Sequence, residues 1–343
     1  MAVLRTGRAA RSSHLQRFLG FPRWNRFRYS DGRVELPRRG VSTIGPSSPF
    51  LPRFLMAIKA PFALASRFVA GETLEAARPA TEEILASGRY VTLDLLGEHV
   101  HDRERAAAFT DAYIDLLRRM AELRTGPRQA NISIKLSMIG QVIDPDFCAA
   151  NLRRLLDEAR AQDVFVRLDM EGSDITQSTL DHFEEVYPLY PDHVGVVLQA
   201  MLKRTEGDVA RMCELNARVR LCKGAYKESA DVAYQDMPTI RKQFVNLMAE
   251  LLQHARYPGI ATHDDLLIDA CKRFVADHAI DREAFEFQML YGIRPATQAQ
   301  IVDEGYNLRV YVPYGTEWLP YFSRRLRERK ENVWFVLSNM FRR

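Results

Sequence analysis

The sequence predicts an α/β fold of the (β/α)₈ TIM barrel class. Beyond residue 88, eight short apolar runs alternate with amphipathic helical stretches, and the runs are apolar throughout rather than at every second position. Strands that alternate with helices pair in parallel through crossover connections, and continuous apolar runs are typical of strands covered on both faces. Eight such strands close into a barrel, which we expect to be distorted and to carry extra N-terminal helices.

The expected strands and helices alternate along the chain beyond residue 88. The expected strands are 90–96, 132–138, 164–170, 194–200, 219–223, 259–263, 285–290 and 309–313. The helices between them repeat their apolar residues at helical spacing. These expected helices are 103–124, 147–161, 179–187, 207–216, 239–255, 266–278 and 297–304. Two helices, at 54–68 and 73–87, are expected before the first strand, and a last helix contains residues 321–330.

Composition divides the chain into an Arg-rich leader, residues 1–52, and a single barrel domain, residues 53–343. Residues 1–40 contain ten Arg, no Lys and two acidic residues, so the rest of the chain has 38 basic and 42 acidic residues. A mildly acidic domain argues against nucleic acid as the main partner. The leader resembles an organelle transit peptide, or it is a flexible, dispensable extension translated from an early start codon. Both interpretations stay open.

The sequence also bears on the cellular compartment. Four cysteines without a CxxC pair favour free thiols in a reducing compartment. The longest apolar stretch, 54–70, is interrupted by Lys59, Pro61 and Arg67 and is unsuited to span a bilayer. No apolar core of a secretory signal stands near the N-terminus. We therefore expect a cytoplasmic protein, with peripheral contact with the inner membrane as an alternative.

Polar side chains stand at the end of nearly every expected strand. In order they are Asp94, Lys135, Asp169 with Glu171, Gln199, Arg220 with Lys223, Thr262 with His263, Gln288, and Tyr311 with Tyr314. Barrel enzymes act at the C-terminal ends of their strands, whereas a barrel interior is mainly filled by branched apolar residues. This concentration predicts a large polar ligand. The alternative is that these are ordinary polar strand ends that hydrogen-bond to nearby loops, which would explain only two or three of these residues.

The last expected helix carries Tyr321, Arg324, Arg325 and Glu328, which can share one face because they are three or four residues apart. A pair of guanidinium groups suits a carboxylate, which it binds through paired hydrogen bonds. A solvated basic face is the alternative.

A metal site is the second chemistry to consider. His99 and His101 follow the first strand and His263 ends the sixth, as in metal-dependent amidohydrolase barrels. Those sites also need a His at the end of strand five and an Asp at the end of strand eight, where this chain has Lys223 and Tyr311. We therefore expect no metal site.

Nucleotide-binding fingerprints of other folds are missing from the sequence. It contains neither GxGxxG nor a Walker A loop, so a Rossmann-type cofactor domain is not supported. A dinucleotide would have to lie across the barrel mouth, where Gly224 in the run Lys223-Gly224-Ala225-Tyr226 offers a weak signal for close approach of a phosphate.

Taken together, these residues resemble the proline dehydrogenase family. The matching segments are SIKLS (133–137), VRLDMEG (166–172), VVLQAMLKRT (196–205), VRLCKGAYKES (219–229), IATHD (260–264), FEFQMLYG (285–292), RVYVPYGTEW (309–318) and YFSRRLRER (321–329). The resemblance implies an FAD-dependent barrel that oxidises L-proline to Δ1-pyrroline-5-carboxylate by hydride transfer from proline C5 to flavin N5. It also implies a quinone as electron acceptor and pyrroline-5-carboxylate dehydrogenase as a pathway partner. A chain of this length favours the monofunctional bacterial type.

The resemblance further implies a role for each matching residue. Lys135, Arg324 and Arg325 would bind the substrate carboxylate, and Tyr311, Tyr321, Tyr226 and Leu290 would wall the ring pocket. Met170, Gln199, Arg220, Lys223, Gly224, Ala225, Thr262, His263 and Glu328 would contact FAD. Asp169 and Arg220 match catalytic positions, and Asp169 would orient Lys135 or Arg325 or relay a proton. A catalytically silent ligand-binding barrel remains the non-enzymatic alternative.

Overall fold

The computed structural model describes residues 62, 65–97, 99–123 and 130–328, together with two short strands near the N-terminus. For residue 130, for residues 324–328 and for those two strands it describes only the backbone. The chain divides into two units, Met1–Pro46 and Ser47–Arg343. The described part of the first unit is an antiparallel pair, β1 (Tyr29–Ser30) and β2 (Arg33–Val34). The rest of the predicted leader lies outside the described residues, and so does most of the predicted helix 54–68, of which residues 65–68 form turns.

The second unit is a closed barrel of eight parallel strands in the order β10-β3-β4-β5-β6-β7-β8-β9. The strands are β3 (Tyr90–Leu95), β4 (Ala130–Ile134), β5 (Phe165–Leu168), β6 (Val194–Gln199), β7 (Val219–Cys222), β8 (Gly259–Ala261), β9 (Glu286–Leu290) and β10 (Leu308–Tyr314). The predicted (β/α)₈ fold is therefore confirmed, and each of the eight predicted strands corresponds to one of these.

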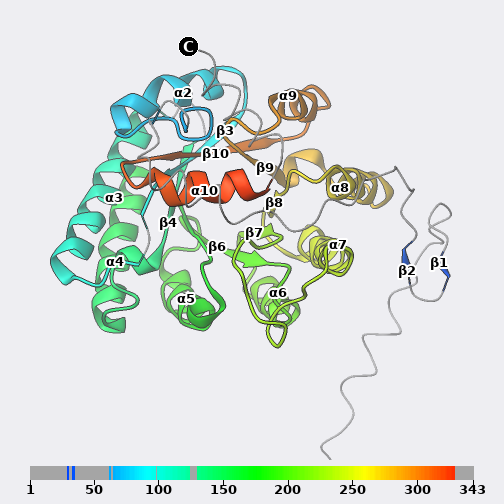
Figure 1. Ribbon diagram of the computed structural model, residues 1–343, viewed down its shortest axis with the longest axis horizontal. Helices are drawn as coiled ribbons and strands as arrows, with labels where there is room; N and C mark the ends of the chain where they lie inside the picture. The colour runs from blue at the N-terminus through cyan, green and yellow to red at the C-terminus, as the bar shows by residue number, and fades with distance from the viewer. Residues whose placement is uncertain are drawn as a thin grey trace, which may run out of the picture. The chain divides into compact units, whose positions relative to one another are not determined.

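A ring of helices surrounds the barrel (Figure 1). The α-helices are α2 (Leu74–Ala86), α3 (Arg103–Leu123), α4 (Pro145–Gln162), α5 (Ser173–Val186), α6 (Thr205–Glu214), α7 (Met237–His254), α8 (Asp265–Asp277), α9 (Pro295–Asp303) and α10 (Trp318–Glu328). Short 3₁₀ turns are η3 (Leu136–Met138), η4 (Tyr187–Leu189) and η5 (Arg282–Ala284). In the part of the chain that the structure describes, no helix is both long enough and apolar enough to cross a bilayer.

Helix α10 lies at the C-terminal end of the barrel. Its Trp318, Tyr321 and Phe322 pack with Leu96, which follows β3, and Ile293, which follows β9. Figure 1 shows this helix crossing the barrel opening. The last helix thus covers the end of the barrel at which the strand-end polar residues gather.

Two predicted boundaries differ from the structure by more than two residues inside the barrel. The run 132–138 was expected to be one strand, but β4 ends at Ile134, and the backbone turns so that the Met138 N–H donates to the Lys135 carbonyl. Helix α5 begins at Ser173, six residues before the expected start, with Gly172 as its N-cap. Its first two turns are mostly polar, so an apolar period could not reveal them.

The barrel interior is far more polar than the branched apolar filling that is usual for this fold. Arg220 on β7 contacts side chains of β4 and β9 and reaches Asp169 after β5, so these residues point inward. Two inward groups recur below. The mouth cluster, near the C-terminal ends of the strands, is Asp94, Lys135, Asp169, Arg220 and Tyr311. The floor cluster, nearer their N-terminal ends, is Arg167, Arg218, Glu286 and Arg309.

Candidate active site

The mouth cluster is built from five different strands or the residues directly after them. The Lys135 Nζ donates to Asp94 Oδ1 over 2.8 Å. Arg220 Nη1 donates to Asp169 Oδ1 and the Tyr311 hydroxyl donates to Asp169 Oδ2, each over 2.7 Å. The carboxylates of Asp94 and Asp169 therefore have fixed hydrogen-bond partners, and these bonds fix the orientation of the Lys135 and Arg220 side chains.

Electrostatics keep the donors of the cluster protonated. Burial opposes the positive charge of Lys135, but the carboxylates of Asp94 and Asp169 outweigh it and raise the pKa of the ammonium group. Burial and the charge of Asp169 raise the pKa of the Tyr311 phenol well above its usual range. Lys135 thus stays a cation and Tyr311 stays a hydrogen-bond donor across the physiological pH range.

The expectation for Asp169 is that it orients Lys135 or Arg325 or relays a proton. The carboxylate that accepts from the Lys135 ammonium is Asp94, and the side chain of Arg325 lies outside the described residues. Asp169 instead joins Arg220 on β7 to Tyr311 on β10. Sequence reasoning named Asp94 as a strand-end residue without giving it a role. The signal that could have found it is an acidic residue on the strand next to a buried Lys.

Arg220 is the most connected side chain of the cluster. Besides Asp169, its Nη1 donates to the Ser133 hydroxyl over 3.1 Å, and its Nε donates to Gln288 Oε1 over 2.5 Å. Its guanidinium carbon lies 5.3 Å from the centre of the Tyr311 ring. Three strands and the residue after a fourth therefore fix its direction.

Most residues expected to contact a cofactor lie at the end of β6 or in the loops after β7 and β8, whereas Met170 follows β5, Arg220 is on β7 and Glu328 is on α10. Gln199 donates to the backbone carbonyl of Glu171 over 2.7 Å, and Lys223 Nζ lies 3.1 Å from Asp264 Oδ2. Gly224 has φ +104°, and a side-chain carbon there would clash with Met201. Only glycine therefore suits this turn, as a loop that approaches a ligand with its backbone requires.

His263 connects the expected cofactor and substrate residues. Its Nε2 accepts a hydrogen bond from the backbone N–H of Leu290 over 2.8 Å. An imidazole that accepts at Nε2 is neutral with its proton on Nδ1, so His263 presents a donor at Nδ1. Arg294 Nη1 in turn donates to the backbone carbonyl of His263 over 2.6 Å.

The chemistry of these groups fits a flavin nucleotide. Lys223 supplies a half-exposed ammonium and the Gly224 turn a close backbone approach, both of which suit phosphate. Thr262 and Gln199 are buried hydrogen-bonding groups of the kind that an isoalloxazine or ribitol needs, and Met170 adds a buried apolar surface. The residues present can therefore hold such a group at the mouth.

The expected residues not yet described lie at the end of β9, in the loop after β7 and on α10. Tyr321 is buried among the apolar residues under α10, and Tyr226, in the loop after β7, packs against the cluster around Met201. Leu290 is partly buried beneath α10. The remaining three, Arg324, Arg325 and Glu328, lie on α10, and the structure describes only their backbone.

The metal alternative concerns His99, His101 and His263. Among them, no group of three or more His, Cys, Asp and Glu side chains lies together as a metal site requires. His99 and His101 are exposed, and His263 is engaged with Leu290.

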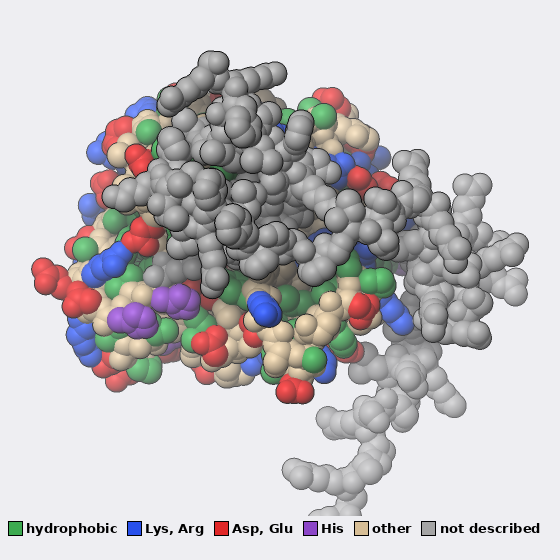
Figure 2. All heavy atoms as spheres, in the orientation of Figure 1, with side chains coloured by type: hydrophobic (Ala, Val, Ile, Leu, Met, Phe, Trp, Pro, Cys, Tyr) green, Lys and Arg blue, Asp and Glu red, His purple; other side chains and the backbone are tan. Residues whose placement is uncertain are grey.

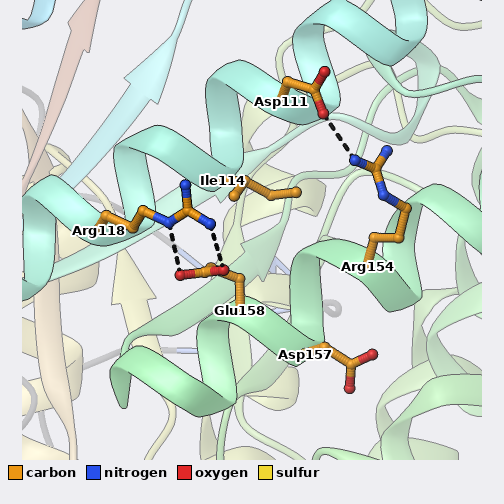
Figure 3. A pocket seen from close by; sticks show the side chains of 6 residues that line it. All are labelled: Asp111, Ile114, Arg118, Arg154, Asp157 and Glu158. Atoms are coloured by element: carbon orange, nitrogen blue, oxygen red, sulfur yellow. Dashed lines mark hydrogen bonds and ion pairs between the residues drawn. The ribbon is translucent and has the colours of Figure 1, made fainter.

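A separate surface pocket of about 470 Å³ lies between α3 and α4 (Figure 3). Arg118 contacts both carboxylate oxygens of Glu158 at 2.9 and 3.0 Å, and Arg154 lies 2.9 Å from Asp111. These ion pairs join α3 to α4, so we interpret the hollow between them as part of a structural contact between the two helices.

Figure 2 shows acidic and basic side chains interspersed over the described part of one face, so neither sign of charge dominates what is visible there.

Comparison with known proteins gives consistent matches. The sequence model of the family described as "Proline dehydrogenase" matches residues 77–338. The chain is 41% identical to "Proline dehydrogenase" of Deinococcus radiodurans over 283 residues, 81% of this chain and 90% of that protein. It is 38% identical to "Proline dehydrogenase 2" of Bacillus subtilis strain 168 over 276 residues, 80% of this chain and 90% of that protein.

A solved structure shows the same fold. It is proline utilization A (PutA) from Bdellovibrio bacteriovorus inactivated by N-propargylglycine, with a TM-score of 0.74 and 26% identity. The match covers 80% of this chain but 34% of that one, so this chain spans about a third of that longer protein.

Proposed function

The chain belongs to the proline dehydrogenase family, a family of flavin-dependent oxidoreductases of proline degradation, and from that premise we propose the site and the course of the reaction. L-Proline is oxidised to Δ1-pyrroline-5-carboxylate at the barrel mouth, with FAD as cofactor and a quinone as electron acceptor. The observation that carries the proposal is the mouth cluster, in which a buried, charged Lys135 faces an Asp169–Arg220–Tyr311 group at the C-terminal ends of the strands.

Lys135 binds the carboxylate of the substrate. One of its three N–H groups donates to Asp94, and the others remain to donate to an anion. Because Asp94 already balances the charge of Lys135, further cations are needed to bind a carboxylate tightly, and we assign these to Arg324 and Arg325. The side chains of Tyr311, Tyr321, Tyr226 and Leu290 wall the pocket of the ring.

The reaction removes a hydride from C5 of L-proline and a proton from its ring nitrogen. Bound FAD supplies the two-electron acceptor for that hydride. Cations around the substrate carboxylate disfavour a protonated amine nearby, which promotes the reactive neutral form. Arg220, held by Asp169 and Gln288, would present a fixed positive charge to a bound flavin and would offset the negative charge that reduction brings.

We assign cofactor contacts to Met170, Gln199, Lys223, Gly224, Ala225, Thr262, His263 and Glu328, together with Arg220. The electrons then pass to a membrane quinone. We therefore propose that this protein is cytoplasmic and contacts the inner membrane peripherally. The product is an imine in equilibrium with an aldehyde, so a pyrroline-5-carboxylate dehydrogenase is the expected next enzyme.

An anaerobic absorbance titration tests the proposal. We expect oxidised-flavin bands near about 380 and 450 nm that bleach when L-proline is added. Lys135→Met should keep the bands and raise the L-proline concentration for half-bleaching by about tenfold or more, since it removes one charged hydrogen bond. Bands that persist with L-proline would contradict the substrate, and a colourless protein that cannot be reconstituted with FAD would contradict the cofactor.

A further inference from the structure

Gln288 on β9 joins the two inward clusters. Its Nε2 donates to Glu286 Oε1 over 2.6 Å, and its Oε1 accepts from Arg220 Nε over 2.5 Å. Gln288 is 4% exposed and Glu286 is 1% exposed, so these bonds form away from water. The amide is therefore the link between the floor carboxylate and the mouth cation.

The surroundings leave the amide a single orientation. Glu286 is a carboxylate and can only accept, whereas the Arg220 guanidinium can only donate. Glu286 stays ionised because, although burial works against the charge, the guanidinium of Arg309 lowers its pKa. The Gln288 NH₂ must then face Glu286 and its carbonyl oxygen must face Arg220. A flipped amide would place two donors and two acceptors against each other in the core.

A missing side chain makes room for this link. Gly259 on β8 stands in register between Arg220 on β7 and Glu286 on β9. A side-chain carbon at Gly259 would clash with Nε2 and Cδ of Gln288. The amide thus occupies the space that any other residue at position 259 would fill, and bridges two strands that are not neighbours.

The floor end of the link is rigid. Arg309 Nε and Nη2 donate to the two oxygens of Glu286 over 2.7 and 2.9 Å, and its Nη1 donates to the Val91 carbonyl over 2.8 Å. Such a paired contact fixes the plane of the carboxylate as well as its position. Its direction is passed on through Gln288 to Nε of Arg220.

We propose that Gln288 is a positioning residue for the reaction, oriented by Glu286 and acting through Arg220, and that Gly259 is required for it. This inference rests on the proposed function, because it gives Arg220 its place beside the flavin. With the amide in place, Arg220 Nε donates to Gln288 on the floor side, and its Nη1 donates to Asp169. Without it, the guanidinium keeps the hydrogen bonds of Nη1 and the contact with the Tyr311 ring but loses the bond that fixes Nε, so it can rotate away from the flavin.

The test uses the flavin-loaded full chain and two variants, Gln288→Met and Gly259→Ala. The first removes both hydrogen bonds at nearly constant volume, and the second displaces the amide without changing a residue of the link. Gln141→Met is the matched control, because Gln141 is a buried glutamine whose bonds run to Ile175, Ser178 and Thr179 instead. We measure the limiting rate of flavin reduction by L-proline, the apparent KM, and the midpoint potential of the flavin by dye equilibration.

We expect the limiting rate to fall by about tenfold in both variants with KM changed less than about twofold, and the midpoint potential to become more negative. The control should keep the wild-type rate and potential. Wild-type values in either folded variant, or an equal loss in the control, would overturn the inference. The potential is measured without L-proline, so a wild-type protein that L-proline fails to reduce would overturn the proposed function separately.

Discussion

The mouth and floor clusters of the barrel hold buried charges in opposite ways. In the mouth, two cations face two carboxylates, and each carboxylate accepts from a cation within 2.8 Å. In the floor, Glu286 is the one carboxylate among the named residues and stands with three arginines. Two of these, Arg167 and Arg218, have side-chain nitrogens without a hydrogen-bond partner among the described residues.

In the floor cluster, aromatic rings partly replace carboxylates as the partners of a guanidinium group. The guanidinium carbon of Arg218 lies 3.8 Å from the centre of the Phe165 ring and 5.2 Å from that of Tyr257. Burial nevertheless lowers the pKa of Arg218 to about 10, although Glu286 opposes the change. The comparison teaches that the charges of the mouth are balanced around the groups to which we assign binding and reaction, whereas the three floor arginines share one carboxylate.

The largest effect should come from removing that carboxylate. Glu286→Gln leaves Arg309 buried without its paired partner and brings the floor to an excess of three charges. We expect the free energy of unfolding to fall by about 3–5 kcal/mol, measured by urea denaturation. A loss below about 1 kcal/mol would show that the floor does not depend on Glu286.

Asp169→Asn should have the next largest effect, on catalysis rather than on folding. The variant keeps the shape of the side chain but loses the charge that holds Arg220 and raises the pKa of Tyr311. We expect kcat/KM for L-proline to fall by about a hundredfold while bound flavin per chain stays constant. Asp157→Asn, in an exposed ion pair with Arg160, is the control that should leave kcat/KM unchanged. Wild-type turnover in Asp169→Asn would reduce the mouth to a structural ion pair.

The same substitution at two floor arginines sharpens the comparison. Arg309→Met should destabilise strongly because it strands Glu286, whereas Arg218→Met removes a guanidinium that has unsatisfied nitrogens. We expect Arg218→Met to leave the free energy of unfolding unchanged or to raise it by about 1 kcal/mol. Equal losses for both variants in thermal denaturation would mean that Arg218 is held as firmly as Arg309.

The smallest effect concerns Glu171, a buried carboxylate outside the two clusters that accepts from a hydroxyl rather than from a cation. Burial raises its pKa, although Ser137, which donates to Oε1 over 2.8 Å, opposes this. Its contribution to stability is therefore full below the pKa of the unfolded chain and declines as pH rises through the higher native value. Glu171→Gln should raise Tm relative to wild type more at about pH 8 than at about pH 5. A constant difference would show that Glu171 does not titrate in this range.

The sequence predicted the barrel, its eight strands and most strand-end residues, because those depend on local periodicity and on the rule that places chemistry at one end. It did not predict the partners within the mouth. The contact of Asp169 with Tyr311 joins β5 to β10 across the barrel, and strand order alone does not determine how far a long side chain reaches.

The polar floor was also missed. Arg167 and Glu286 are single charged residues within apolar runs, and from the sequence such a side chain is easily interpreted as facing a loop or solvent. In the structure both side chains are buried. Only the closure of the barrel places them in one enclosed space, and only the absence of a side chain at Gly259 allows Gln288 to bridge its strands. The 3₁₀ turn at Leu136–Met138 escaped for a related reason, because a continuous apolar run does not show where its backbone turns.

The most direct test of the account is a crystal structure of the flavin-loaded protein soaked anaerobically with L-proline. We predict the flavin at the C-terminal ends of the strands beside Arg220, with the proline carboxylate within hydrogen-bond distance of Lys135 Nζ and of the side chains of Arg324 and Arg325. L-Proline bound elsewhere, or a flavin away from Arg220, would contradict the assignment of the mouth cluster as the active site.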